Sequence, residues 1–276
     1  IFSSNKYYKE GLSRYESEDY SNSILSLKKA IDINPENAEA YNLIGVAKYD
    51  LNFDDCHIQH RGYKPPEKCT EIMSSIVIHY NKALELNPQY AEAYLNRGQA
   101  KHQIGNHSEA IADINNALAI NPKYAKAYSE KSLIEWHLED LQGALTDANK
   151  ALEIDPNLSA AYTNRGLANL GLGNHSLAVK DLEKAIEIDP KNAYAYNNLG
   201  AAKSWLGKRK EAIIYYDKAI EIQPNLAIAY RNRGMDRSWS NIPNRRQLVC
   251  SDWKKAYSLG YKDPEIKKSL RAWRCR

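Results

Sequence analysis

Two of the four cysteines and two of the seven histidines lie in one short segment, CHIQHRGYKPPEKC, from Cys56 to Cys69. Sulfur and imidazole are zinc ligands, so the candidates for a metal site are Cys56, His57, His60 and Cys69. The usual C-x2–4-C and H-x3–5-H spacings are absent, however, and adjacent Cys and His side chains fit one tetrahedral ion poorly. A disulfide between Cys56 and Cys69 would close a short loop and add about 3 kcal/mol of stability. Two free thiols are the third alternative.

The elements that must position this segment follow from an internal repeat. Prolines recur at positions 35, 88, 122, 156, 190 and 224, in steps of 34 residues apart from one step of 53. Each unit contains two apolar runs at helical spacing, with a GN or GK break between them in three units and NP or DP at the end of most. A residue before proline is pushed out of the helical region, so the second helix ends there. Two helices joined by so short a turn must pack as an antiparallel hairpin, which predicts an all-α chain.

These units resemble the tetratricopeptide repeat (TPR) family, whose marks are an aromatic residue at position 4, small residues at 8, 20 and 27, and proline at 32. In the unit from Ala91 to Tyr124 the corresponding residues are Tyr94, Gly98, Ala110, Ala117 and Pro122. The resemblance implies a right-handed superhelical solenoid of antiparallel helix hairpins, in which the first helices line a concave groove. We expect a single solenoid over residues 4–276, with units 4–37, 38–90, 91–124, 125–158, 159–192, 193–226 and 227–263. A basic capping helix would follow over 264–276. The second unit is 19 residues longer than the others, which predicts an inserted loop at about residues 52–70.

Charges at positions 7 and 23 of the unit occur together. Position 7 is Arg97, Lys131, Arg165 and Arg233 in four units, and position 23 of the same units is Asp113, Asp147, Asp181 and Asp252. Where position 7 is Ile44 or Leu199, position 23 is not acidic. We therefore predict an ion pair between the two helices of these units, with a structural role.

The resemblance also implies that positions 2, 5, 6, 9, 12 and 13 of each first helix face the groove. Positions 5 and 6 contain Asn42, Asn96, Asn164, Asn197, Asn198 and Asn232. An asparagine amide both donates and accepts, so a ladder of them can bind the backbone of an extended peptide. Positions 12 and 13 add aromatic and histidine side chains, namely Tyr15, Tyr49, His102, Trp136, His137, Trp205 and Trp239. Of these, His102, Trp136 and Trp205 are groove candidates, although each could instead fill space between hairpins. No three consecutive units carry the family's clamp for a C-terminal carboxylate.

The remaining cysteines, Cys250 and Cys275, are 25 residues apart. Two neighbouring antiparallel helices would bring them together, and the segment resembles the disulfide-tied last hairpin of some bacterial repeat proteins. The four cysteines then form two local pairs with none left over, as in oxidising compartments. We therefore favour disulfides Cys56–Cys69 and Cys250–Cys275 and an extracytoplasmic compartment, periplasm or lumen, with the cytoplasm as the alternative.

Charge is distributed unevenly along the chain. The formal net charge is +4, yet residues 231–276 contain 13 Lys and Arg against 4 Asp and Glu. A basic end on an acidic body is typical either of a solvated cap or of a surface for an anionic partner. No apolar run approaches the ~18 residues of a transmembrane span, and without an initiator Met or a signal-peptide pattern we expect a mature or trimmed form.

No phosphate-binding glycine loop, nucleophile elbow or HExxH motif is present. We therefore expect neither an enzyme nor a cofactor, but a protein–protein interaction scaffold or assembly adaptor that binds an extended peptide of its partner in the groove. One alternative is the recognition arm of a larger enzyme. Another is an anionic partner, nucleic acid or membrane, bound by the basic C-terminal region. Nucleic acid is the less favoured of the two because no nucleic-acid motif is present. Self-association through the edges of the solenoid is a further candidate.

Overall fold

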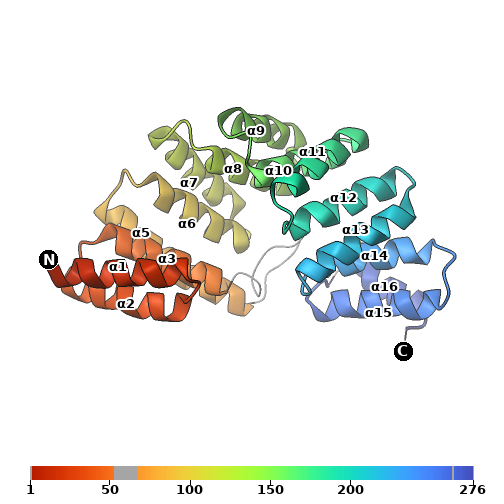
Figure 1. The fold of residues 1–276 in the computed structure, drawn as a ribbon, viewed down its shortest axis with the longest axis horizontal. Coiled ribbons are helices and arrows are strands. Elements are labelled where there is room, and N and C mark those ends of the chain that lie inside the picture. Colours follow the sequence, from red (N-terminus) through yellow and green to blue (C-terminus); the bar gives the residue numbers. More distant parts are fainter. Residues whose placement is uncertain (1, 53–66, 263, 276) are drawn as a thin grey trace. The chain divides into compact units, whose positions relative to one another are not determined.

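The computed structural model describes residues 2–52, 67–262 and 264–275, and these residues form helices and turns without any strand. The helices follow one another as antiparallel pairs (Figure 1), which confirms the predicted all-α class of helix hairpins. The seven pairs are α1 (Phe2–Glu16) with α2 (Tyr20–Ile33), α3 (Ala38–Leu51) with α5 (Glu67–Leu86), α6 (Ala91–Gln103) with α7 (His107–Ile120), α8 (Ala125–His137) with α9 (Leu141–Ile154), α10 (Ser159–Gly171) with α11 (His175–Ile188), α12 (Ala193–Trp205) with α13 (Arg209–Ile222), and α14 (Ala227–Ser238) with α15 (Arg245–Ser258). A last helix, α16 (Pro264–Ala272), follows them.

The described residues form two compact units. The first unit contains α1 to α7 and continues into α8 as far as Ile134. The second unit begins at Glu135, inside the same helix, and continues to the end of α16. None of the described helices combines the length and the apolar character needed to cross a bilayer.

The turns between repeats are built by the residue that precedes proline. The backbone N–H of Asn121 donates to the carbonyl of Ala117 at 2.9 Å, and its side-chain oxygen accepts from the backbone N–H of Lys123 at 3.1 Å. Asp155 and Asp189 make the same two bonds in the turns after α9 and α11. Asn and Asp suit this position because a short polar side chain bonds the backbone two residues on. Proline then prevents the second helix from continuing.

Close approach within a hairpin depends on small residues. A Cβ atom placed on Gly200 of α12 would lie 2.6 Å from the Tyr216 ring of α13. Ala212 and Ala219 of α13 are fully buried. Only small side chains at these positions allow the two helices to pack this closely, because protein interiors are close-packed and contain few voids that could take a larger side chain. The family positions 8, 20 and 27 therefore have a packing role here.

The second repeat contains the inserted segment. α3 ends at Leu51 and α5 begins at Glu67, so the last four residues of the predicted loop, 67–70, are helical. Cys69 lies in the first turn of α5 and is buried. With 20 residues, α5 is longer than the second helices of the other described repeats.

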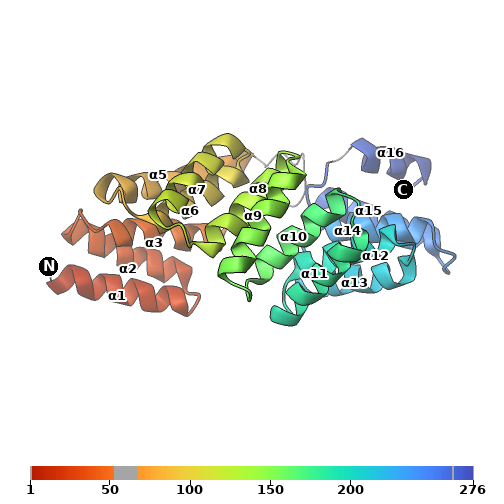
Figure 2. The same cartoon turned by 90° about the horizontal axis from the view of Figure 1, so that it is seen from above.

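The second unit ends with the segment that the sequence predicts as a cap. Ile266 of α16 is buried in the same cluster as Trp253 and Val249 of α15. The Trp273 ring meets the Trp253 ring edge-on, with 5.8 Å between the centroids. In Figure 2 α16 lies beyond α15, at the end of the chain. Ile266 is buried and Leu270 packs, partly buried, against the same cluster, while most of the other side chains of α16 are polar.

Candidate functional site

First helices of consecutive repeats are neighbours within each unit. In the first unit α3 contacts both α1 and α6, and in the second unit α12 contacts both α10 and α14. The residues of positions 5, 6, 9, 12 and 13 therefore meet across successive repeats, as a groove-facing surface requires.

Two of the predicted asparagines of the first unit bond to each other across neighbouring repeats. The Asn96 amide of α6 donates to the side-chain oxygen of Asn42 on α3 at 3.0 Å. The Asn42 amide in turn donates to the hydroxyl of Tyr90 at 3.2 Å. Asn42 is buried and Asn96 is half-buried. Asn42 therefore joins repeats, whereas Asn96 retains a carbonyl oxygen with no partner among the described residues.

The second unit contains a similar chain of amides. The Asn232 amide of α14 donates to the Asn197 oxygen of α12 at 3.1 Å, and the Asn197 amide donates to the Asn198 oxygen at 3.0 Å. Arg231 donates to the Asn232 oxygen at 3.1 Å. Asn197 is buried, while Asn198 and Asn232 are half-buried and accessible in part. Asn164 is buried on α10, so the asparagines of this unit differ in their access to a ligand.

The three other groove candidates lie in different surroundings. His102 is only 1% exposed, and its Nδ1 lies 2.9 Å from Nδ1 of His107. This corrects the expected groove role of His102, because its ring fills the space between α6 and the start of α7. Trp205 is 72% exposed at the end of α12 and stacks on His175, with 5.5 Å between the ring centroids. Trp136 is half-buried, with its ring edge-on to that of His137.

A pocket of about 300 Å³ opens on the first helices of the first unit. It is lined by Tyr15, Val46, Tyr49, Asp50, Tyr80, Asn96 and Gln99. All of these except Tyr80 occupy positions 6, 9, 12 or 13 of the first three repeats. The hydroxyl of Tyr15 donates to Oδ2 of Asp50 at 2.7 Å. Burial raises the pKa of Asp50 above its ordinary range, and the hydrogen bond from Tyr15 offsets part of the rise.

The sequence reasoning missed Asp50 and Gln99 as pocket residues. Both occupy groove positions, 13 and 9, but neither is an asparagine, a histidine or an aromatic residue, the types from which the groove candidates were chosen. A search of positions 9 and 13 for every polar side chain would have found them.

The predicted ion pairs form in both units. Arg97 donates to Asp113 through Nε at 2.8 Å and through Nη2 at 2.5 Å. Arg165 with Asp181 and Arg233 with Asp252 form equivalent two-pronged bonds. Lys131 lies in the first compact unit and Asp147 in the second, so that pair stays a prediction.

Each of these arginines also reaches the preceding repeat. Nη1 of Arg97 donates to the Asn81 oxygen at 2.8 Å, and its guanidinium lies over the Tyr94 ring at 5.4 Å. Arg165 and Arg233 repeat both contacts. The arginines at position 7 therefore link neighbouring repeats as well as the two helices of one repeat. The tyrosine beneath each guanidinium is the aromatic residue that the family carries at position 4.

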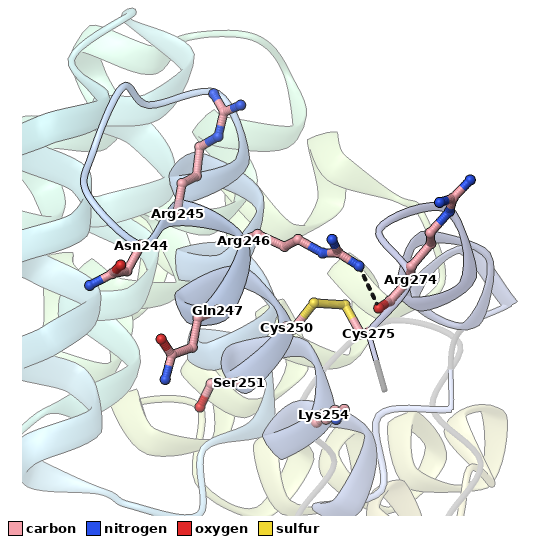
Figure 3. Close-up of a pocket in the computed structure, with 9 residues that line it drawn as sticks. All are labelled: Asn244, Arg245, Arg246, Gln247, Cys250, Ser251, Lys254, Arg274 and Cys275. Carbon is pink, nitrogen blue, oxygen red and sulfur yellow. Dashed lines mark hydrogen bonds between the residues drawn. A yellow bond between two sulfur atoms is a disulfide. The ribbon is translucent and has the colours of Figure 1, made fainter.

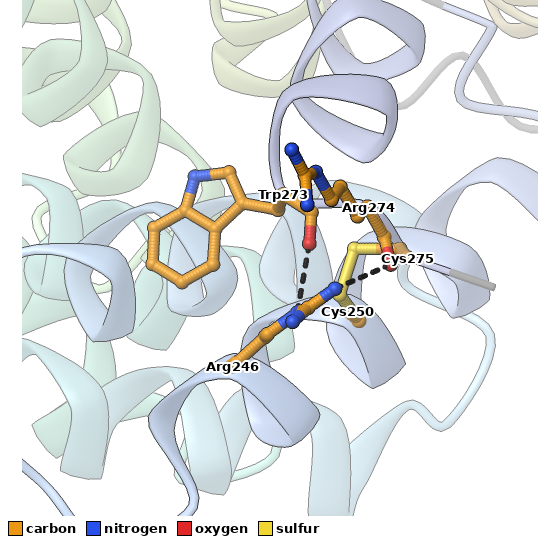
Figure 4. Close-up of a disulfide and its surroundings, with 5 residues drawn as sticks. All are labelled: Arg246, Cys250, Trp273, Arg274 and Cys275. Carbon is orange, nitrogen blue, oxygen red and sulfur yellow. Dashed lines mark hydrogen bonds between the residues drawn. A yellow bond between two sulfur atoms is a disulfide. The ribbon is translucent and has the colours of Figure 1, made fainter.

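A second, basic pocket lies at the C-terminal cap. Cys250 and Cys275 form a disulfide with 5.3 Å between their Cα atoms. Beside it, Arg246 donates to the backbone carbonyls of Trp273 and Arg274, both at 2.9 Å (Figure 4). A pocket of about 750 Å³ opens here, lined by Asn244, Arg245, Arg246, Gln247, Cys250, Ser251, Lys254, Arg274 and Cys275 (Figure 3).

The proposed metal ligands cannot be placed together. Cys56, His57 and His60 lie outside the described residues, and Cys69 is one of the three described cysteines, all of which are disulfide-bonded. In the part of the chain that the structure describes, no three His, Cys, Asp or Glu side chains gather as a metal site would require.

Comparison with known proteins supports the repeat assignment. A family model described as "TPR repeat" matches residues 11–52 and 77–105, and models described as "Tetratricopeptide repeat" match residues 103–159, 159–192 and 193–226. No curated protein matches the chain.

Among solved structures, a tetratricopeptide repeat protein from Parabacteroides merdae ATCC 43184 is 20% identical, with a TM-score of 0.70 over 99% of each chain. The APC/C hetero-tetramer Cut9–Hcn1 is 15% identical with a TM-score of 0.79, over 95% of this chain and 48% of that one. A thermophilic TPR protein of Thermus thermophilus is 17% identical with a TM-score of 0.58, over 66% of this chain and 98% of that one. These likenesses concern the fold. With the family models matching both compact units, the chain belongs to the tetratricopeptide repeat family.

Proposed function

We propose that this protein is a non-catalytic adaptor that binds an extended peptide segment of a partner along its first helices. Proteins with this repeat generally mediate protein–protein interactions. The observation that carries the proposal is that half-buried amides lie on first helices of each unit, Asn96 on α6 of the first and Asn198 on α12 and Asn232 on α14 of the second. Each amide has only part of its hydrogen-bonding capacity used inside the protein, so the rest is available to a peptide backbone. Each such bond adds about 0.5–1.5 kcal/mol, so several must act together.

The test is selection of binding peptides from a random displayed library, followed by affinity measurements on variants. We expect Asn96→Ala and the double variant Asn198→Ala with Asn232→Ala each to weaken the selected peptides by about tenfold. Asn22→Ala is the matched control, because Asn22 is exposed on a second helix. Equal binding by all folded variants would refute a groove site.

A second candidate function rests on the basic pocket beside the disulfide. Arg245, Arg246 and Lys254 place positive charge around one opening, which favours an anionic partner. An oligonucleotide and phosphatidylglycerol vesicles are the two probes. Binding of either that falls steeply with added salt and is lost in Arg245→Gln with Lys254→Gln would support this candidate. Salt-insensitive binding, or none, would count against it.

We also propose that the protein resides in an oxidising compartment. The Cys250–Cys275 disulfide supports this, because such bonds are rare where thiols are kept reduced. Alkylation of the protein in its source cells, before any reduction, should then label no cysteine. Labelling of Cys250 and Cys275 would place it in a reducing compartment.

A further inference from the structure

The pocket on the first unit contains a carboxylate that has no cationic partner among the described residues. Among the residues that the structure describes, no Lys or Arg pairs with Asp50, whose described partner is the hydroxyl of Tyr15. Two buried carboxylates elsewhere in the repeats do have cations. Asp113 binds both Arg97 and Lys101, and Asp252 binds both Arg233 and Arg237. Since a partly buried charge without a counter-charge costs stability, a cationic ligand would give Asp50 the partner that Asp113 and Asp252 already have.

The two amides of the pocket present acceptors. The Asn96 amide group donates to Asn42, and the Gln99 amide group donates to Oε2 of Glu130 at 3.2 Å. Their carbonyl oxygens accept no bond from any described residue. These two carbonyl oxygens and the second carboxylate oxygen of Asp50 are hydrogen-bond acceptors, so a ligand that binds all three must bring donors.

The rest of the lining favours a planar cation. Tyr15, Tyr49 and Tyr80 contribute three aromatic rings to the pocket, and aromatic faces attract cations. The surroundings are also negative. Burial raises the pKa of both Tyr15 and Tyr80 in the lining, and the charges of Asp50 and Glu92 add to each rise.

We propose that the pocket of Tyr15, Asp50, Asn96 and Gln99 receives an arginine side chain of the extended peptide, with the guanidinium against Asp50 and the two amide oxygens. This rests on the proposed peptide-binding function and names a specificity determinant for it. Arginine fits better than lysine because its guanidinium supplies five N–H donors in one plane and stacks on aromatic rings. A peptide with an acidic side chain at this place would be repelled by Asp50, so the pocket also selects against acidic segments.

The experiment is an NMR titration of the full ¹⁵N-labelled chain with the peptide acetyl-Ser-Ser-Arg-Ser-Ser-amide. The same peptide with citrulline in place of arginine is the neutral comparison, since it keeps the shape and loses the charge. We expect the arginine peptide to shift the signals of residues lining the pocket, with an affinity about tenfold or more above that of the citrulline peptide. Asp50→Asn should reduce binding of the arginine peptide to the citrulline level. Asp32→Asn, an exposed change on α2, should leave it unchanged.

Each other outcome overturns the assignment. Equal shifts with both peptides, arginine binding that survives Asp50→Asn, shifts confined to other surfaces, or no shift at the solubility limit would each contradict an arginine pocket. None of these outcomes bears on whether library-selected peptides depend on Asn96, Asn198 and Asn232. The pocket assignment and the adaptor function therefore fail separately.

Discussion

Two aspartates of the first unit show how the surroundings of a carboxylate set its role. Asp113 is 3% exposed and receives a two-pronged bond from Arg97 and a further bond from Lys101. Asp50 lies in an open pocket with one tyrosine hydroxyl as its described partner. The first arrangement holds helices together. The second leaves charge at the surface where a partner can use it.

Because burial raises the pKa of Asp50, its charge is a cost to the folded state at neutral pH. Between the ordinary pKa of aspartate and the raised one, the native state binds more protons than the unfolded state, so this contribution to stability falls as pH rises. We expect Asp50→Asn to raise the free energy of unfolding at pH 7. The gain should disappear as pH falls below the ordinary aspartate pKa, where Asp50 is protonated in both states.

Urea unfolding of wild type and variant across this pH range is the measurement, with Asp32→Asn as the exposed control. Loss of stability at pH 7 on Asp50→Asn would mean that Asp50 is a structural residue, and its role in the proposed arginine pocket would be weakened too.

The Arg97–Asp113 pair predicts a different pattern. Asp113→Ala leaves the side chain of Arg97, only 18% exposed, without its counter-charge, and should cost about 3–5 kcal/mol. Adding Arg97→Leu removes the stranded charge and imitates the repeat in which Leu199 occupies position 7. The double variant should therefore be more stable than Asp113→Ala alone in denaturant unfolding. A double variant that loses the sum of the two single changes would show that the pair is not coupled.

Much of this residue-scale detail could be predicted from the sequence. The joint occurrence of charges at positions 7 and 23 predicts the Arg97–Asp113 bond, because opposite charges that occur together in some repeats and are both absent from others indicate side chains in contact. The bond from Arg97 to Asn81 of the preceding repeat could not be predicted this way, since an asparagine carries no complementary charge to mark it. The acceptor character of the pocket depends on which way the Asn96 and Gln99 amides turn, and only the surrounding hydrogen bonds decide that.

At the scale of elements, the last hairpin and its cap are held by few contacts. α16 has nine residues, too few to be stable as an isolated helix. This end of the chain is attached by the apolar contacts of Ile266 and Leu270, the Trp253–Trp273 contact, the two bonds from Arg246 and the disulfide. The disulfide closes a loop of about 25 residues, for which chain entropy gives about 3–4 kcal/mol.

Cys250→Ser with Cys275→Ser should therefore loosen α16 while the remaining hairpins stay folded. Amide hydrogen exchange followed by mass spectrometry is the measurement, and we expect faster exchange over residues 264–275. Residues 107–120, which form α7 in the other unit, serve as the internal control. Unchanged exchange in α16 would show that the tryptophan pair and Arg246 hold the cap without the sulfur bond.

Many element boundaries could also be predicted from the sequence, because NP or DP marks the end of most second helices and a GN or GK break follows three of the first helices. The start of α5 at Glu67 could not, since the insertion disturbs the 34-residue period from which the other boundaries follow. His102 shows that a residue's role cannot always be predicted from its position in the family's repeat. Its place at position 12 predicts a groove residue, yet its packing against His107 buries it.

At the scale of the whole molecule, each repeat contacts mainly its neighbours in sequence. The stability of such a chain is a sum of local terms, and its parts need not unfold together. The boundary between the two compact units lies inside α8, between Ile134 and Glu135. All five tryptophans, Trp136, Trp205, Trp239, Trp253 and Trp273, lie after this boundary. Tryptophan fluorescence therefore reports the second unit alone, whereas far-ultraviolet circular dichroism reports the helices of both.

We expect the two probes to give different urea transitions. Asp113→Ala removes an ion pair of the first unit, and should shift part of the circular dichroism transition to lower urea by about 1 M or more while tryptophan fluorescence is unchanged. Asp181→Ala removes the equivalent pair of the second unit, and should shift the fluorescence transition by a similar amount. The two variants are matched in the substitution and in repeat position, and each removes the counter-charge of one arginine, although Asp113 also binds Lys101 and Asp181 also accepts from the Asn169 amide. If both shift both probes equally, the seven hairpins unfold as one cooperative body and the boundary inside α8 has no energetic meaning.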